Sequence, residues 1–188
     1  MFNALASRPL LASTKIKVAA TAITFCGALF GTSVSIAQQT QRVSLPTVST
    51  KYTQQQSIEV GDVPNHQIRI FEYQRVYGAD GPMISGVHIK DSRTHGISDY
   101  TDSTGSGSVY VTYMMENGDK IYTHGSIVTH GVPNAGGKKT LSTLAALTIT
   151  GGTGKFLGVH GVVRNETPAD LAAGINQGKG EIEYWMEK

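Results

Sequence analysis

The chain has 188 residues, with 16 basic and 14 acidic side chains and one cysteine. This length suits a single ordinary domain. Three basic residues, Arg8, Lys15 and Lys17, lie in the first 37 positions, where there is no acidic residue, so the rest carries 13 basic against 14 acidic residues, a net charge of −1. A nearly neutral remainder gives no electrostatic reason to expect a nucleic-acid partner or an anionic membrane surface.

Residues 1–37 have the pattern of a secretory signal peptide. The basic residues precede an apolar run from Val18 to about Val34, and the segment 35–37 (Ser-Ile-Ala) places small residues at the −3 and −1 positions of a cleavage site. An uncleaved membrane anchor is the alternative, because the run is nearly long enough to span a bilayer. The Thr and Gly content of the run favours cleavage after Ala37, which predicts a secreted or periplasmic protein without a membrane segment.

Removal of the signal peptide also removes the sole cysteine, Cys26. An exported domain without disulfides must be held together by its core. Residues 38–60 are rich in Gln, Ser and Thr and carry few apolar side chains. This composition predicts a flexible N-terminal arm over 38–65, ahead of a domain that covers 66–188.

From His66 onward the sequence alternates as strands do. The segment around Asn117-Gly118 predicts a hairpin, with a loop of two or three residues. A second hairpin is expected at the glycines of 151–154, and helical periodicity is confined to "TPADLAAG" at 167–174. Short strands with turn signals about every ten residues indicate an all-β sandwich or barrel.

The stretch "ITGGTGKF" at 149–156 raises the question of a phosphate-binding loop. The P-loop pattern needs a glycine at position 149, which is Ile, and Ser or Thr after the lysine, where Phe156 stands. Phosphate loops also need a following helix whose free amides face the anion, but "FLGVHGVVR" follows here. The stretch is therefore predicted to be a hairpin turn in which the glycines supply positive φ.

The wider context of this turn, "LTITGGTGKFLGVHGVVR", resembles the segment by which allene oxide cyclases and plant dirigent proteins are recognised. The segment "YVTYMMENGDKIYTHGSI" is similar to the central hairpin of that family, and "IFEYQRVYGADGP" to its first barrel strand. The resemblance covers roughly 66–188. It implies an eight-stranded antiparallel β-barrel, lipocalin-like in form, around a mostly apolar cavity, and usually a trimer.

The resemblance also implies site residues. Allene oxide cyclases use a glutamate on the first strand to steer ring closure, and Glu72 matches it. Gln74 matches an asparagine that helps hold a water on the substrate, and Pro82 falls at a serine-proline pair, displaced by one residue and preceded by a glycine without a hydroxyl. Ser98 is the nearest counterpart of the family's pocket cysteine. Dirigent proteins instead place an aspartate near the start of this strand.

The residues themselves leave two orientations of strand 66–77 open. Glu72 shares one face with Ile68, Ile70, Gln74 and Val76. If that face is interior, burial raises the pKa of Glu72 and makes it a usable acid or base. In the other orientation Phe71, Tyr73 and Tyr77 point inward and Glu72 lies in water. With the resemblance added, we expect Glu72 inside.

The histidines show no tight spacing of metal ligands, so we expect no metal site and no cofactor. The functional hypothesis is an exported barrel that binds a small apolar or aromatic molecule and steers a cofactor-free cyclisation, isomerisation or coupling beside Glu72. Whether the protein is an enzyme stays open, and an isomerase or cyclase is the form it would take. The alternatives are a lipocalin-like carrier and a structural or surface barrel without an open pocket.

Overall fold

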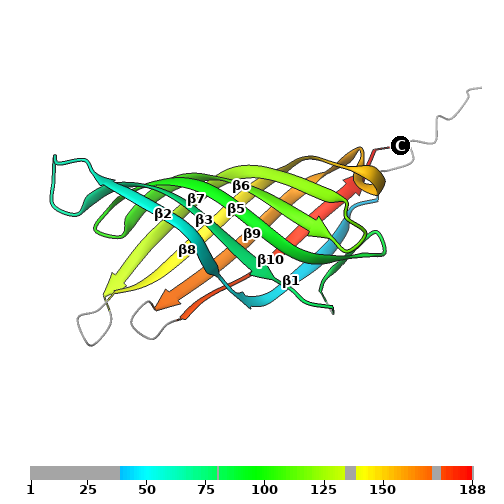
Figure 1. The fold of residues 1–188 in the computed structure, drawn as a ribbon, viewed down its shortest axis with the longest axis horizontal. Helices are drawn as coiled ribbons and strands as arrows, with labels where there is room; N and C mark the ends of the chain where they lie inside the picture. The colour runs from blue at the N-terminus through cyan, green and yellow to red at the C-terminus, as the bar shows by residue number, and fades with distance from the viewer. Residues whose placement is uncertain (1–38, 80, 134–138, 171–174, 188) are drawn as a thin grey trace, which may run out of the picture. The chain divides into compact units, whose positions relative to one another are not determined.

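The computed structural model describes residues 39–79, 81–133, 139–170 and 175–187. The chain divides into two compact units, Met1–Ile36 and Ala37–Lys188, of which only the second contains described residues. That unit is all-β and antiparallel (Figure 1). Its elements are β1 (Gln41–Ser49), β2 (Lys51–Glu59), β3 (His66–Val76), β4 (Met83–Ile84), β5 (Val87–Thr101), β6 (Thr104–Met115), β7 (Lys120–Pro133), β8 (Lys139–Gly152), the 3₁₀ turn η1 (Gly154–Phe156), β9 (Val159–Asp170) and β10 (Ile175–Met186).

The strands form one sheet in the order β1-β10-β9-β8-β7-β6-β5-β3-β2, and the short β4 pairs with β5. The two edge strands, β1 and β2, are consecutive in the chain and separated only by Thr50, so that Figure 1 shows them as one continuous ribbon. Because one segment pairs with β10 through its first half and with β3 through its second half, the sheet must curl. The predicted closed barrel of eight strands is corrected to a curled sheet of ten, in which no ladder joins the two edges among the described residues.

The segment predicted as a flexible arm supplies both edge strands, so that prediction is wrong. β1 pairs with β10, and Leu45 is buried in the core. β2 pairs with β3 over its length, although nearly all of its side chains are exposed. An edge strand with solvent on most sides can be polar in composition, because its backbone pairing provides the order. The composition therefore resembles that of a linker.

Two further sequence predictions concern β9. The hairpin at the glycines is confirmed: β8 and β9 are antiparallel neighbours, connected through η1 with no α-helix behind it. The loop is fixed to the β6–β7 turn, because Lys120 N donates to Thr153 Oγ1 (2.9 Å) and Lys155 N donates to Asp119 Oδ2 (3.0 Å). The helix at 167–174 is wrong for residues 167–170, which belong to β9, and 171–174 lie outside the described residues.

One end of the curled sheet is filled by apolar side chains. Phe156 of η1 is fully buried there, as is Ile84 of β4. Tyr184 is also buried at this end, where its hydroxyl accepts from Ser85 N (2.9 Å) and donates to Gln41 Oε1 (2.6 Å). The other members are the large buried residues at neighbouring strand ends: Ile89, Met115, Ile121, Val159 and Ile182. This core closes one end, and the space that remains lies toward the other.

Candidate functional site

The interior of the curled sheet contains a cavity of about 730 Å³. Its wall comes from every long strand except β1. It extends to the end of the sheet opposite the apolar core, where Asn65 and Asp102 belong to turns. The apolar side chains of the wall are Phe71, Val109, Val111, Ile127, Leu141, Ala145, Leu147 and Ala169. The volume is within the range of small-molecule sites.

The inner face of β3 contributes Arg69, Phe71, Tyr73 and Arg75 to this wall. Since side chains alternate along a strand, the intervening residues point outward. Ile70, for example, is 60% exposed. The prediction that Glu72 faces the interior is therefore wrong, and the other orientation of the strand is the one observed.

Two glycines make room for the side chains of β3. A Cβ on Gly96 of β5 would lie 2.7 Å from Phe71 Cε2 and 2.8 Å from Val109 Cγ1, closer than real side chains approach. A Cβ on Gly178 of β10 would lie 2.6 Å from a terminal guanidinium nitrogen of Arg75. The phenyl ring and the guanidinium group thus lie flat against glycine backbone, which is a common reason for glycine within a strand.

Aromatic rings form one side of the cavity. Phe71 and Tyr73 are stacked, with ring centroids 6.0 Å apart and planes at 3°. Tyr52 of β2 meets both rings edge-on, at 6.2 Å from Phe71 and 5.6 Å from Tyr73. These offset and T-shaped pairs are the arrangements that aromatic quadrupoles favour. The rings support one another and present a rigid flat surface to the cavity.

Two arginines lie among these rings. Arg75 is only 6% exposed, and it donates from Nε to Thr50 Oγ1 (3.0 Å) and from a terminal nitrogen to Thr167 Oγ1 (2.8 Å). Arg69 is half-buried, and its guanidinium carbon lies 4.9 Å from the centre of the Phe71 ring. It donates to Gln55 Oε1 at 3.3 Å. The cavity wall is therefore both aromatic and positively charged.

No carboxylate or imidazole of the described residues reaches the inner part of this wall. Asp102, at the rim, is the one acidic lining residue among them, and it forms an ion pair with Lys139. Tyr113 and Tyr77 lie beyond the aromatic wall, and burial raises the pKa of both hydroxyls well above their ordinary range. They stay protonated at neutral pH, so they act as hydrogen-bonding groups and not as bases.

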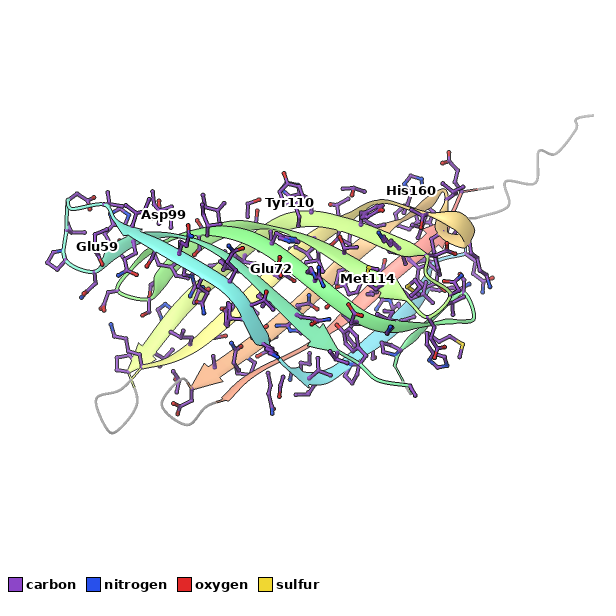
Figure 2. The ribbon with its side chains drawn as sticks, in the orientation of Figure 1. Glu59, Glu72, Asp99, Tyr110, Met114 and His160 are labelled. Carbon is purple, nitrogen blue, oxygen red and sulfur yellow. The ribbon has the colours of Figure 1, made fainter. Side chains whose placement is uncertain are left out.

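Glu72 lies on the outer face, midway along the sheet (Figure 2). Its carboxylate accepts from Thr53 Oγ1 (2.6 Å) and forms an ion pair with His95 Nε2 (2.8 Å). These contacts hold the pKa of Glu72 below its ordinary value, first through the Thr53 hydrogen bond and then through His95 and the charge of Arg93. An interior position would have raised the pKa of Glu72. The observed shift is downward, because hydrogen bonds from Thr53 and His95 stabilise the ionised carboxylate.

An outer groove of about 320 Å³ adjoins Glu72 and His95. Tyr110 of β6 stacks on His124 of β7 with ring centroids 4.2 Å apart, and His124 Nε2 lies 2.9 Å from Ser108 Oγ. The paired strands place these side chains in adjacent rows on one face. The groove is shallow and flanked by exposed apolar residues, which is typical of a contact surface.

The four residues proposed from the resemblance do not come together. Glu72 and Gln74 share the outer face of β3, as the alternation requires. Pro82 lies between β3 and β4, where its carbonyl accepts from Ile89 N (2.8 Å). Ser98 of β5 is on the inner face, 1% exposed, and its Oγ has no hydrogen-bond partner among the described residues. Of the four, only Ser98 faces the interior.

At the open end of the cavity, His66 connects Asp62 of the β2–β3 turn with Asp99 of β5. His66 Nδ1 lies 2.5 Å from Asp62 Oδ1, and His66 Nε2 lies 2.7 Å from Asp99 Oδ1. The two carboxylates raise the pKa of His66, Asp62 first and Asp99 second. Figure 2 shows Asp99 at the same end of the sheet as Glu59, with His160 at the other. In the part of the chain that the structure describes, no three His, Cys, Asp or Glu residues form a metal-binding group.

Comparison with known proteins yields a remote structural likeness and no family. No family model matches the sequence, and no curated protein matches it. Among solved structures, a pterocarpan synthase dirigent protein aligns over 88% of this chain and 100% of its own, with 12% sequence identity and a TM-score of 0.48. The likeness is too distant to carry that protein's activity or ligand to this chain. Separately, none of the described residues forms a helix with the length and apolarity needed to cross a membrane.

The β3 residues that line the cavity belong to the face with Phe71 and Tyr73, which the sequence left open as the alternative orientation of the strand. Two signals favoured them: the aromatic rings at alternate positions and the glycine at 96 that accommodates one of them. The expectation for the opposite face came from the family resemblance. Arg69 and Arg75 also lie on the observed inner face, and charged residues are rarely buried without a partner. Tyr52 was missed because its segment had the composition of a linker.

Proposed function

We propose that the protein binds a small apolar or aromatic molecule in the cavity on the inner side of the sheet. The observation that supports this proposal is the cavity of about 730 Å³, walled by stacked rings and aliphatic side chains. Flat apolar ligands gain from burial against such a wall, and hydroxyl groups at the edge, such as those of Tyr100 and Thr129, can orient them. The same cavity is the argument against a purely structural barrel.

Chemistry in this cavity is a second candidate function. A cyclisation, isomerisation or coupling without a cofactor can be steered by shape, because rigid walls select one conformer of a reactive substrate. The observation that favours it is the pair of guanidinium groups, Arg69 and Arg75, which are donors suited to negative charge that develops on oxygen. Glu72 has no part in this proposal, since its carboxylate lies on the outer face. A lipocalin-like carrier uses the same cavity without the reaction.

Titration with a neutral flat probe tests the binding proposal. We expect 2-naphthamide to bind the purified protein with one site per chain in calorimetry, and native mass spectrometry to show small molecules that the protein retains from its host. The retained molecules also identify the chemical class of the natural ligand. Absence of both retained molecules and probe binding would contradict the proposal.

We also propose that the protein is exported after cleavage behind Ala37. Support comes from the signal-peptide pattern of residues 1–37. Intact-mass measurement of the exported protein tests it. The expected mass corresponds to a chain that starts at Gln38 and contains no thiol, whereas a mass that retains residues 18–37 indicates an anchored form.

A homo-oligomer, most simply a trimer, completes the proposal. Large apolar side chains are exposed on the outer face of the sheet, and those of its middle part are between 38% and 61% exposed: Ile68, Ile70, Ile97, Tyr110, Val128 and Leu144. We call these six residues the outer apolar patch. Cross-strand pairing joins Ile70 with Ile97 and Val128 with Leu144. Exposed apolar side chains grouped on one face are typical of protein contacts.

A further inference from the structure

The cavity contains two guanidinium groups, and the described part of the chain offers neither of them an ionised partner. Arg69 and Arg75 both project from the inner face of β3 into the cavity. None of the described carboxylates forms an ion pair with either residue. The one acidic side chain in the described part of the wall, Asp102, is bound to Lys139 at the rim. The interior therefore carries two positive charges that none of the described residues neutralises.

Isolated charge in a protein interior is unfavourable unless an opposite charge compensates it. Arg75 is only 6% exposed, yet it donates to the neutral hydroxyls of Thr50 and Thr167. The ring of Tyr73, with its centre 5.1 Å from the guanidinium carbon, offsets part of the lost solvation. Neutral partners of this kind position a guanidinium group, but they supply no counter-charge.

Arg69 has a buried hydrogen-bond donor to which the described part of the chain offers no acceptor. Its Nε is buried and has no hydrogen-bond partner among the described residues. Ser98, which pairs with Arg69 across β3 and β5, has a buried Oγ in the same condition. The guanidinium group lies among the rings of Tyr52, Phe71 and Tyr100, at 5.6, 4.9 and 5.9 Å. Buried donors without acceptors are rare in native proteins, and a bound ligand is one of the ordinary reasons for them.

We propose that the natural ligand is an aromatic carboxylate, that Arg69 donates to its carboxylate group, and that Arg75 supplies the second positive charge deeper in the cavity. This inference rests on the proposed function, because it concerns the same cavity. The planar fork of arginine matches the two oxygens of a carboxylate. The stacked rings of Phe71 and Tyr73 suit a flat apolar body attached to it.

The test compares two probes of nearly the same shape, 2-naphthoate and the neutral 2-naphthamide, by calorimetry at fixed pH and salt. We expect the carboxylate to bind at least about tenfold more tightly, as a charge-assisted hydrogen bond predicts. Arg69→Gln should abolish this preference, since glutamine keeps polar bulk without charge. Arg93→Gln, at an exposed arginine of β5, is the matched control and should change neither affinity.

The outcomes separate the two proposals. If both probes bind with equal affinity to the wild type, the carboxylate inference is overturned while the binding function stands. If neither probe binds, the proposed function fails and the inference with it. If the preference survives in Arg69→Gln and is lost in Arg75→Gln, the assignment of the contact to Arg69 is wrong. Circular dichroism confirms folding, and the half-buried Arg69 carries the test should Arg75→Gln fail to fold.

Discussion

Phe71 and Glu72 are neighbours in the chain and lie on opposite sides of the sheet. Phe71 is 4% exposed and lines the cavity, whereas Glu72 forms an ion pair with His95 in the outer groove. Consecutive residues of β3 therefore lie on opposite faces, one toward the cavity and the next on the outer face of the sheet. The position that family resemblance selected for catalysis is on the wrong side of the strand for a reaction in the cavity.

Glu72→Gln is therefore expected to leave binding of a neutral probe in the cavity unchanged. The substitution should produce only a small shift in melting temperature at neutral pH, because glutamine can keep the hydrogen bond to Thr53 and the lost ion pair is with an exposed histidine, His95. The pKa of Glu72 is lowered in the folded state, so its stabilising effect is present above the ordinary glutamate pKa and is lost as pH falls through the folded value. Melting curves and titrations of both proteins at pH 7 and pH 4 measure this. Loss of probe binding by Glu72→Gln at pH 7 would show that Glu72 contributes to the binding site after all.

Gly96→Ala should close part of the cavity from behind. The new Cβ would meet Phe71 Cε2 and Val109 Cγ1 within 2.8 Å, so the phenyl ring must shift toward the cavity. We expect a stability loss of roughly 1–3 kcal/mol, as for other overpacked cores, and weaker probe binding. Phe71→Leu in the same chain should restore part of both, because it removes the clash. Identical losses in the single and double variants would contradict the steric explanation.

His66 should make the open end of the cavity sensitive to pH. Its pKa is raised by Asp62 and Asp99, so the protonated form is stabilised in the folded protein. That stabilisation is complete below the unfolded pKa of histidine and is lost as pH rises through the higher folded pKa. The melting temperature of wild type should thus exceed that of His66→Gln most clearly near pH 5.5, and the difference should shrink at pH 8.5. A difference that grows with pH would be inconsistent with the Asp62–His66–Asp99 bridge.

Charge placed in the outer apolar patch should break the proposed oligomer. Val128 and Leu144 are paired across β7 and β8, and they are 57% and 59% exposed. We expect the double variant Val128→Glu, Leu144→Glu to be monomeric in light scattering with unchanged circular dichroism, since burial of two carboxylates opposes association. Leu157→Glu, at a position 69% exposed and outside the patch, is the control. If the wild-type protein is already monomeric at micromolar concentration, the proposed homo-oligomer is wrong.

Much of the fold could be predicted from the sequence because its information is local. Alternation identified the β class, and Asn117-Gly118 and the glycines at 151–154 marked turns that the structure contains. The edge strands could not be found in this way. The pairing of β1 with β10 is non-local, and the polar side chains of both edge strands carry no periodic signal.

The candidate site was harder to predict, since it depends on which face of β3 is interior. Both faces of that strand mix apolar with polar residues, so hydrophobicity alone does not choose between them. The choice is made by distant partners: Gly96 and Gly178 leave space that Phe71 and Arg75 occupy. Thr167, which receives a hydrogen bond from Arg75, is on a strand that the sequence analysis assigned in part to a helix.

The most direct test of the account uses two neighbouring alanines of β8. Ala145 lines the cavity, and Ala146 is exposed on the outer face. Calorimetric titration of 2-naphthamide into Ala145→Phe and Ala146→Phe asks which side of the sheet holds the ligand. Because a phenyl group at 145 occupies cavity space beside the aromatic wall, we predict that Ala145→Phe weakens binding by at least about tenfold, as steric exclusion of a small ligand requires, and that Ala146→Phe binds as the wild type does. Binding that survives in Ala145→Phe and is lost in Ala146→Phe would contradict the account and place the site in the outer groove.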